Sequence, residues 1–353
     1  MKNFFLLLFG IFMISTIHSQ DQTVGLFYNQ NPSFNGYSLF APFRSTTTYL
    51  IDNCGRVVNS WESEYLPSCS VYLLENGHLL RTCLIESPTF TNIAGLGGRV
   101  EEYDWDGNLV WHYEYHAINY QQHHDIEPLP NGNILLLVWD AYTPNEAVQA
   151  GRIPANLLDS FWSEKIVEIK PLPNNEAEIV WEWKLWDHLI QDFNAERDNF
   201  GIVSEHPELI DINFSAETGT NSLFDWIHGN AIDYNEELDQ IILSSRNLSE
   251  FYIIDHSTTT EEAAGHSGGT YNKGGDILYR YGNPKAYKHG INNIRQLSFQ
   301  HNPHWIKKEY NNDWQIMVFS NLHRVDTSAV IIITPPVSEP VALFTPTGIR
   351  LRA

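Results

Sequence analysis

Residues 126–137 read IEPLPNGNILLL and carry the strongest local structural signal in this 353-residue chain. The Asn131-Gly132 pair lies between two apolar runs. Both residues of such a pair tolerate the positive φ that a tight hairpin turn requires. The same order of apolar run, Asn/Asp/Gly turn and apolar run recurs along the chain. The stretch therefore predicts one hairpin of a repeated β-structure.

Each repeat unit has two halves, and the second half is this hairpin. The first half is an apolar run, a turn and a second run that usually ends in Trp; the first halves lie at 48–61, 100–111, 166–183 and 251–281, and the second halves at 71–80, 126–137, 232–243 and 305–318. The units are about 50 residues apart where no insertion intervenes, and each is expected to give about four antiparallel strands. Such sheets bury both faces when they stack radially, which predicts an all-β fold of the β-propeller type. A β-sandwich is the alternative, but it does not explain the shared order of the units.

Residues 20–353 are predicted to form a single propeller domain. Three segments interrupt the repeat and are interpreted as loops or lids, the first two partly helical and the third Gly-rich and mobile: they lie near 145–163, 186–223 and 263–275. Only four clear units precede the C-terminal fragments at 329–334 and 342–345. We therefore expect a ring that is incomplete at the C-terminus or closed by N-terminal strands around 24–39.

The first 19 residues have the pattern of a secretion signal peptide. Lys2 supplies the positive start, residues 4–14 are apolar, and Ser19 provides a small residue before the expected cleavage point. The apolar run is too short to span a bilayer, and no later stretch has about 18 apolar residues in a row. The sequence predicts an exported protein, periplasmic or secreted, without a membrane span.

Composition excludes several classes of protein. Apolar residues make up 42% and charged residues 18%, which argues against disorder. The net charge of −22, from 21 basic and 43 acidic residues, argues against nucleic acid or an anionic membrane as a partner. Cys54, Cys69 and Cys83 would allow one disulfide after export, but the sequence fixes neither their pairing nor an oligomeric state.

Histidines recur just before the hairpin in three of the four units. The segments are QQHHDI at 121–126, DWIHGNAI at 225–232 and SFQHNPHW at 298–305. Matching positions in propeller blades lie at one distance from the axis, so these imidazoles are expected to converge in the central channel. Converging imidazoles suit a metal ion or an anion, with Asp125 and Asp225 as orienting partners. Arg246 would repel a divalent metal and grip an oxyanion through its planar fork, which favours an anionic substrate.

These segments, with LPNGN at 129–133 and SSR at 244–246, resemble those of the bacterial arylsulfate sulfotransferase family, and the similarity runs from about residue 40 to 335. The resemblance implies a six-bladed propeller with its active site in the channel. It implies transfer of a sulfuryl group from an aryl sulfate to a phenolic acceptor, without a nucleotide donor, cofactor or metal. Some members carry a separate N-terminal β-domain, for which this sequence has little room.

The same resemblance assigns roles to residues. His301 would be the nucleophile that is transiently sulfated in a ping-pong reaction, and His228 and Arg246 would bind the sulfuryl oxygens. The motif leaves the register of the adjacent histidines open, and His124 is favoured as the fourth catalytic residue; the expected substrate-binding residues are His123, Asn230, Asn302 and His304. Two alternatives remain, a secreted propeller that binds a ligand or protein without turnover and a metal-dependent propeller hydrolase.

Overall fold

The computed structural model describes residue 30 and residues 33–91, 93–214, 224–289, 295–306, 313–324 and 327–336. The signal peptide predicted at 1–19 lies outside these residues and stays a prediction. The described chain is built mainly from strands, and its two α-helices, α1 (Pro144–Gln149) and α2 (Thr260–Ala263), are short. The all-β prediction is thus confirmed. None of the described helices has the length and apolar character needed to cross a membrane.

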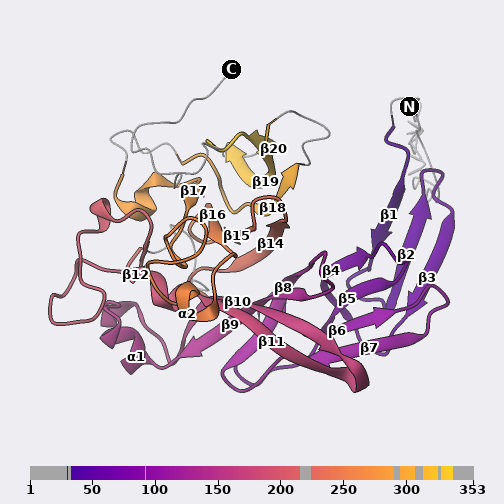
Figure 1. The fold of residues 1–353 in the computed structure, drawn as a ribbon, viewed down its shortest axis with the longest axis horizontal. Helices are drawn as coiled ribbons and strands as arrows, with labels where there is room; N and C mark the ends of the chain where they lie inside the picture. Colours follow the sequence, from indigo (N-terminus) through magenta and orange to yellow (C-terminus); the bar gives the residue numbers. More distant parts are fainter. Residues whose placement is uncertain are drawn as a thin grey trace, which may run out of the picture.

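Five antiparallel sheets, each made of strands consecutive in sequence, form the blades of a β-propeller arrangement (Figure 1). The first contains β1 (Tyr37–Phe40), β2 (Thr47–Asp52) and β3 (Val57–Glu62). The second contains β4 (Pro67–Leu73), β5 (Leu79–Leu84), β6 (Gly98–Tyr103) and β7 (Leu109–Glu114). The third contains β8 (Tyr120–Pro128), β9 (Ile134–Tyr142), β10 (Phe161–Leu172) and β11 (Glu176–Lys184). The fourth contains β14 (Gly229–Asn235), β15 (Gln240–Ser245), β16 (Glu250–Asp255) and β17 (Tyr279–Tyr281), and the fifth contains β18 (His301–Ile306), β19 (Gln315–Arg324) and β20 (Thr327–Ile333).

The blades follow one another along an arc, with β1–β3 and β18–β20 at its two ends (Figure 1). Within the described residues, these two end sheets do not pair with each other. The family resemblance predicts six blades, whereas the described part of the chain forms five. The fragment noted at 329–334 belongs to β20, and the fragment at 342–345 lies outside the described residues.

The predicted hairpins are present, but the blade boundaries are shifted relative to the predicted units. Gly77 and Gly132 adopt φ values of 83° and 85° in the turns after β4 and β8. The two halves of a unit, however, fall in different blades. β2 and β3 complete the first blade, and the chain then crosses to β4, the first strand of the second. A blade therefore combines the hairpin of one unit with the Trp-containing pair of the next.

The apolar core lies between adjacent blades. One cluster joins the second and third blades, a larger one joins the third and fourth, and another joins the fourth and fifth; representative pairs are Leu80 with Leu136, Trp181 with Tyr252, and Ile253 with Val318. Full burial of a large apolar side chain stabilises the fold by about 1.5–3 kcal/mol relative to exposure. Blade-to-blade packing therefore holds the arc together without pairing of its end sheets.

Two of the three predicted insertions contain short regular elements. Residues 145–163 cover most of α1, the turn η1 (Pro154–Asn156) and the start of β10. Residues 186–223 contain η4 (Val203–Glu205), most of η3 (Leu185–His188), and the parallel pair β12 (Leu189–Ile190) and β13 (Ile210–Asp211). Residues 264–278 connect α2 to β17. The other short helical turns are η2 (Pro173–Asn175) and η6 (Pro284–Tyr287).

The three cysteines are free, so the disulfide that export would allow is not formed in the structure. Cys54 and Cys69 are exposed. Cys83 is buried, its Sγ lies 3.1 Å from Oε2 of Glu101, and burial raises the pKa of its thiol. Cys83 is therefore a packing residue.

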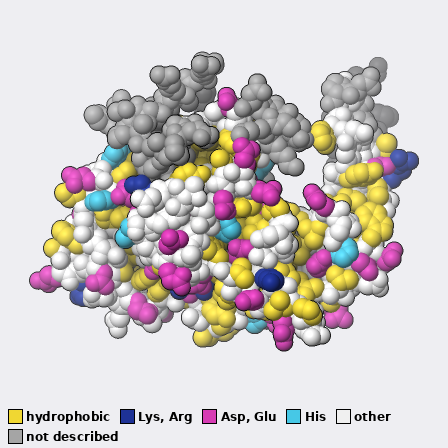
Figure 2. Space-filling view, in the orientation of Figure 1, with side chains coloured by type: hydrophobic (Ala, Val, Ile, Leu, Met, Phe, Trp, Pro, Cys, Tyr) yellow, Lys and Arg dark blue, Asp and Glu magenta, His cyan; other side chains and the backbone are white. Residues whose placement is uncertain are grey.

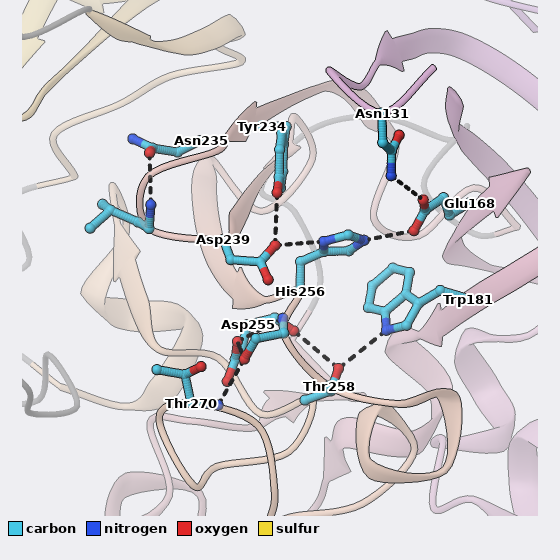
Figure 3. A network of polar contacts seen from close by, with 12 residues as sticks. Asn131, Glu168, Trp181, Tyr234, Asn235, Asp239, Asp255, His256, Thr258 and Thr270 are labelled. Carbon is cyan, nitrogen blue, oxygen red and sulfur yellow. Dashed lines mark hydrogen bonds and ion pairs between the residues drawn. The ribbon is translucent and has the colours of Figure 1, made fainter. Parts of the chain in front are cut away.

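His256 links the third and fourth blades through two carboxylates (Figure 3). Its Nδ1 lies 2.8 Å from Oδ1 of Asp239, in the turn between β14 and β15, and its Nε2 lies 2.9 Å from Oε2 of Glu168 on β10. The ring also packs edge-on against Trp181. Burial alone would lower the pKa of His256, but the two hydrogen bonds outweigh it and raise the pKa to about 9. The imidazolium thus holds two blades together at neutral pH.

This contact predicts a specific pH dependence of stability. Because the pKa of His256 is higher in the folded than in the unfolded chain, its contribution is complete below about pH 6.5 and is lost as pH rises through about 9. We expect this loss to reach at most about 3 kcal/mol. Urea unfolding at pH 6 and pH 9.5 should show a larger decrease for the wild type than for His256→Asn. Equal decreases in both proteins would mean that His256 does not carry the effect.

Candidate functional site

The first strands of four blades break their pairing register at matching places. The shifts lie between Pro67 and Val71 in β4, Gln122 and Ile126 in β8, Gly229 and Ala231 in β14, and His301 and His304 in β18. Bulges of this kind redirect side chains and are frequent next to active sites. The histidines predicted from the repeat lie within or beside three of these bulges.

The backbone at the same places is strained. His124, His228, Phe299 and Asn302 have φ values of 48°, 50°, 49° and 51°. A positive φ is uncommon for residues other than glycine, costs about 1–3 kcal/mol, and is concentrated at functional sites. The fold thus holds the predicted histidine segments in a costly conformation at one end of the inner strands.

The predicted catalytic residues lie close enough to one another to shift each other's pKa values. The imidazole rings of His124 and His228 meet with their centroids 4.8 Å apart. Burial lowers the pKa of His124 far below its ordinary value, and His123, His228, His301 and Arg246 lower it further. Burial also lowers the pKa of His301, with Arg246 and His228 acting in the same direction. The structure therefore brings His124, His228, His301 and Arg246 together from three blades.

Hydrogen bonds fix the tautomer of His301. Its Nδ1 lies 2.7 Å from Oδ1 of Asn321 on β19 and 3.1 Å from the carbonyl oxygen of Phe299. A carbonyl oxygen only accepts hydrogen bonds, so Nδ1 carries the proton. The lone pair of the neutral ring is therefore on Nε2, the nitrogen that a nucleophile would use.

Arg246 is a cation with unused donors. Its backbone N–H donates to the carbonyl of His228 at 3.1 Å, its Nη1 donates to Oδ1 of Asn247 at 3.1 Å, and its Cζ lies 4.9 Å from the ring centre of Phe299. No ion pair joins it to a carboxylate within the described residues. Acidic side chains are spread over the face shown in Figure 2, while Lys and Arg are few. A partly buried guanidinium that forms no ion pair with any described carboxylate is suited to an oxyanion.

Glu164 on β10 extends the site behind the histidines. Its Oε2 lies 2.8 Å from Nε2 of His123, and Nδ1 of His123 lies 2.8 Å from Nδ1 of His124. Its Oε1 accepts the backbone N–H of Gly229 at 2.6 Å. A Cβ at Gly229 would lie 2.8 Å from Cδ of Glu164, so only glycine allows this approach. Glu164 therefore connects the third blade to the residue that follows His228.

The pKa shifts of this chain of groups indicate where its protons lie. Burial raises the pKa of Glu164 well above its ordinary value and lowers that of His123 well below. A carboxylic acid at Glu164 donates to His123, whose Nδ1–H then donates to Nδ1 of His124. This order leaves Nε2 of His124 as a donor. A donor at this position suits an anion, whereas a metal would need a lone pair.

The remaining candidate residues occupy different environments. Nδ1 of His228 is hydrogen-bonded to Oδ2 of Asp225, the orienting partner expected from the sequence. Asp125 instead accepts the backbone N–H of Ile232 at 3.0 Å and contacts no histidine side chain through a described hydrogen bond. Three expected substrate-binding residues lie in or against the segment that carries His301: Asn230 donates to the carbonyl of Gln300, Asn302 is exposed, and Nδ1 of His304 lies 3.0 Å from the Asn302 carbonyl oxygen.

Sequence reasoning missed Glu164 and Asn321. Glu164 could have been noticed as one of two acids, with Glu168, in the stretch FWSEKIVEI at 161–169, all of which is buried. Such a group needs a buried partner. Asn321 on β19 has no comparable signal, because a polar residue near a strand end is ordinary.

Comparison with known proteins identifies the family of the chain. A sequence model described as arylsulfotransferase (ASST) matches residues 39–330. The chain belongs to the arylsulfotransferase family. The matched region starts in β1 and ends in β20, so it includes all five blades and every candidate site residue. The protein is accordingly an arylsulfate sulfotransferase that acts on small molecules. A separate comparison with curated proteins found no match to its sequence.

Solved structures similar to this arylsulfotransferase are distant. Hydrazine synthase of Kuenenia stuttgartiensis is 12% identical over 84% of this chain and 67% of its own, with a TM-score of 0.43. A hypothetical selenium-binding protein from Sulfolobus tokodaii is 11% identical over 81% of this chain and 55% of its own, with a TM-score of 0.43. The Cps50 (Swd1) β-propeller domain of Myceliophteria thermophila is 12% identical over 88% of this chain and 73% of its own, with a TM-score of 0.33.

Proposed function

We propose that this arylsulfotransferase moves a sulfuryl group from an aryl sulfate to a phenolic acceptor in two steps, through a sulfated His301. The observation that carries the proposal is the pair of hydrogen bonds from Nδ1 of His301 to Phe299 and Asn321, which leaves Nε2 as the nucleophile. The lowered pKa of His301 keeps this lone pair available near neutral pH. This lone pair is the nucleophile that the first step of the proposed reaction needs.

In the first step, Nε2 of His301 attacks the sulfur of the donor. The N–S bond forms as the S–O bond to the aryl group breaks, and the bonding electrons leave with the phenolate oxygen. A phenol has a pKa of about 10, as tyrosine does, so it leaves far more readily than an alkyl alcohol. The released phenolate takes up a proton from the solvent. In the second step the acceptor phenol returns a proton to the solvent, and its oxygen attacks the same sulfur. The N–S bond breaks and the lone pair returns to Nε2.

Arg246 and His124 would donate to the non-bridging sulfuryl oxygens. Nδ1 of His228 faces the carboxylate of Asp225, so His228 would donate to such an oxygen from Nε2 as the imidazolium. These donors are already in place, so they would stabilise the charge that shifts onto these oxygens without reorganisation. Glu164 and His123 would keep His124 in the donor tautomer. Asp225 would hold the ring of His228 in place through Nδ1.

A chromogenic transfer assay tests this function. The purified protein is incubated with 4-nitrophenyl sulfate, with and without phenol, after treatment with a chelator and well below its unfolding temperature. We expect nitrophenol release that depends on the acceptor, survives chelation and gives the parallel double-reciprocal lines of a ping-pong reaction. Release that is lost on chelation would instead identify a metal-dependent hydrolase. Absence of release at every pH from a folded protein would identify a binding propeller.

Export also remains a proposal. The signal-like residues 1–19 would direct the enzyme to the periplasm or the medium. The N-terminal sequence of the protein recovered from those fractions would begin near residue 20.

A further inference from the structure

A second cluster of metal-binding side chains lies away from the channel, beside the outer strands of the third and fourth blades. His188 ends η3, which directly follows β11, while His266 and Asp276 lie in the segment between α2 and β17. The ligand atoms of the three residues lie within 4.8 Å of one another. The proposed sulfuryl transfer uses none of them.

The three side chains converge on one carboxylate oxygen. Nδ1 of His188 and Nδ1 of His266 each lie 2.8 Å from Oδ1 of Asp276. The two rings are nearly perpendicular, with an interplanar angle of 86° and centroids 5.8 Å apart. Two ring nitrogens thus approach one carboxylate oxygen from different directions.

The hydrogen bond made by Nε2 of His188 determines which nitrogen of the ring carries the lone pair. Nε2 is 2.8 Å from the carbonyl oxygen of Ala263, so it carries a proton and donates it. In a neutral ring Nδ1 then has a lone pair, yet it faces the acceptor oxygen of Asp276. A second proton on His188 would remove this conflict, and so would a cation bound between the two groups. Histidines that ligate metals usually donate their other N–H to a carbonyl or carboxylate in this way.

The surroundings hold His188 rigidly. Its ring is fully buried and lies parallel to that of Trp183, with centroids 5.6 Å apart. Trp183 donates from Nε1 to the carbonyl of Gly275 at 2.7 Å. A Cβ at Gly275 would lie 2.0 Å from the Ala263 oxygen and 2.6 Å from Nε2 of His188, so glycine is required for this close packing. Asp276 is also buried, whereas the side chain of His266 is 61% exposed and is free to adjust.

We propose that His188, His266 and Asp276 bind one divalent ion of the zinc class, with water in the fourth position. Zinc prefers imidazole nitrogen and carboxylate oxygen at about 2.0–2.2 Å, which separates tetrahedral ligands by about 3.3 Å. Rotation of the exposed His266 ring lengthens its 2.8 Å contact with Asp276, whereas the 2.8 Å contact between His188 and Asp276 would need a shift of about 0.5 Å in these buried groups. Calcium and magnesium prefer oxygen ligands and do not suit this set. The ion would fasten the segment before β17 to the third blade.

Zinc binding to the full-length, tag-free protein tests the site. The protein is freed of metal with a chelator and titrated with Zn²⁺ against a chromophoric competitor, and its unfolding temperature is recorded with and without the ion. We expect one tight site per chain and a higher unfolding temperature with Zn²⁺. His266→Ala, which removes an exposed ligand without opening the core, should weaken binding at least about 10-fold and abolish the thermal shift.

Two further variants separate this site from other histidines. His206→Ala removes a partly exposed ring that pairs with Glu208, and it should bind Zn²⁺ as the wild type does. His301→Ala should also keep the tight site, because His301 belongs to the channel. The inference is overturned if the wild type has no site tighter than that of His266→Ala. It is also overturned if tight binding is lost in His301→Ala but kept in His266→Ala.

Discussion

His301→Ala is expected to lower the rate of sulfuryl transfer by at least about 1,000-fold, with little change in stability. The side chain of His301 is only partly buried, and its hydrogen bonds are to Asn321 and the Phe299 carbonyl. Its removal therefore leaves no large cavity and no buried charge. What is lost is Nε2, the one atom in the proposed reaction that bonds to sulfur.

A burst experiment distinguishes a nucleophile from a residue that only binds the sulfuryl group. With donor and no acceptor, the wild type should release one nitrophenolate per active site and stop, while His301→Ala should release none. His78→Ala is the matched control, since His78 lies in the turn after β4, at the opposite end of that strand from the bulge, and pairs with Glu102. A full burst from His301→Ala would assign the nucleophile to another residue.

The repeat in the sequence was sufficient to predict the architecture, because each hairpin is specified locally. The glycines of the Asn-Gly turns leave few conformations for a short connection other than a tight turn. Division of the strands into blades was less predictable. Whether β3 pairs onward or the chain crosses to β4 depends on packing between sheets, and that information is spread over many apolar positions.

The candidate site shows the same difference between features that are specified locally and features that depend on packing between sheets. His124, His228 and His301 could be found because they recur at one place in the repeat, and the structure shows that this place is a strained bulge. Glu164 does not recur. It contacts His123 within its own blade and the backbone of Gly229 across a blade boundary. Contacts of this kind depend on how two blades meet, which no single repeat encodes.

The zinc-class site is a further example of a feature that depends on packing between distant segments of the chain. His188 and Asp276 are far apart in the sequence; His188 lies in one predicted insertion, and Asp276 directly follows another. Neither has the close ligand spacing by which zinc sites are usually recognised. The sequence-based expectation of no metal rested on Arg246 in the channel and on the family resemblance, and neither concerns this cluster. The packing of His188 against Ala263 and Gly275 brings the ligands together.

Arg246→Lys is expected to lower kcat/KM about 100-fold, the second largest effect on activity. The substitution keeps the positive charge, so the local field is largely preserved. It removes the planar fork that binds two oxygens at once, and it removes the stacking on Phe299. Loss of donors that act mainly on the transition state should lower kcat more than it raises KM.

Comparison with a second arginine decides whether geometry or charge matters at this position. Arg197→Lys makes the same change at an exposed residue that donates to Gln149, and its activity should match that of the wild type. If Arg246→Lys were equally active, a point charge would be sufficient at this site. Arg246 would then attract the anionic donor without gripping its oxygens. The stabilisation of the transferring group would have to come from His124 and His228, whose rings meet at 4.8 Å.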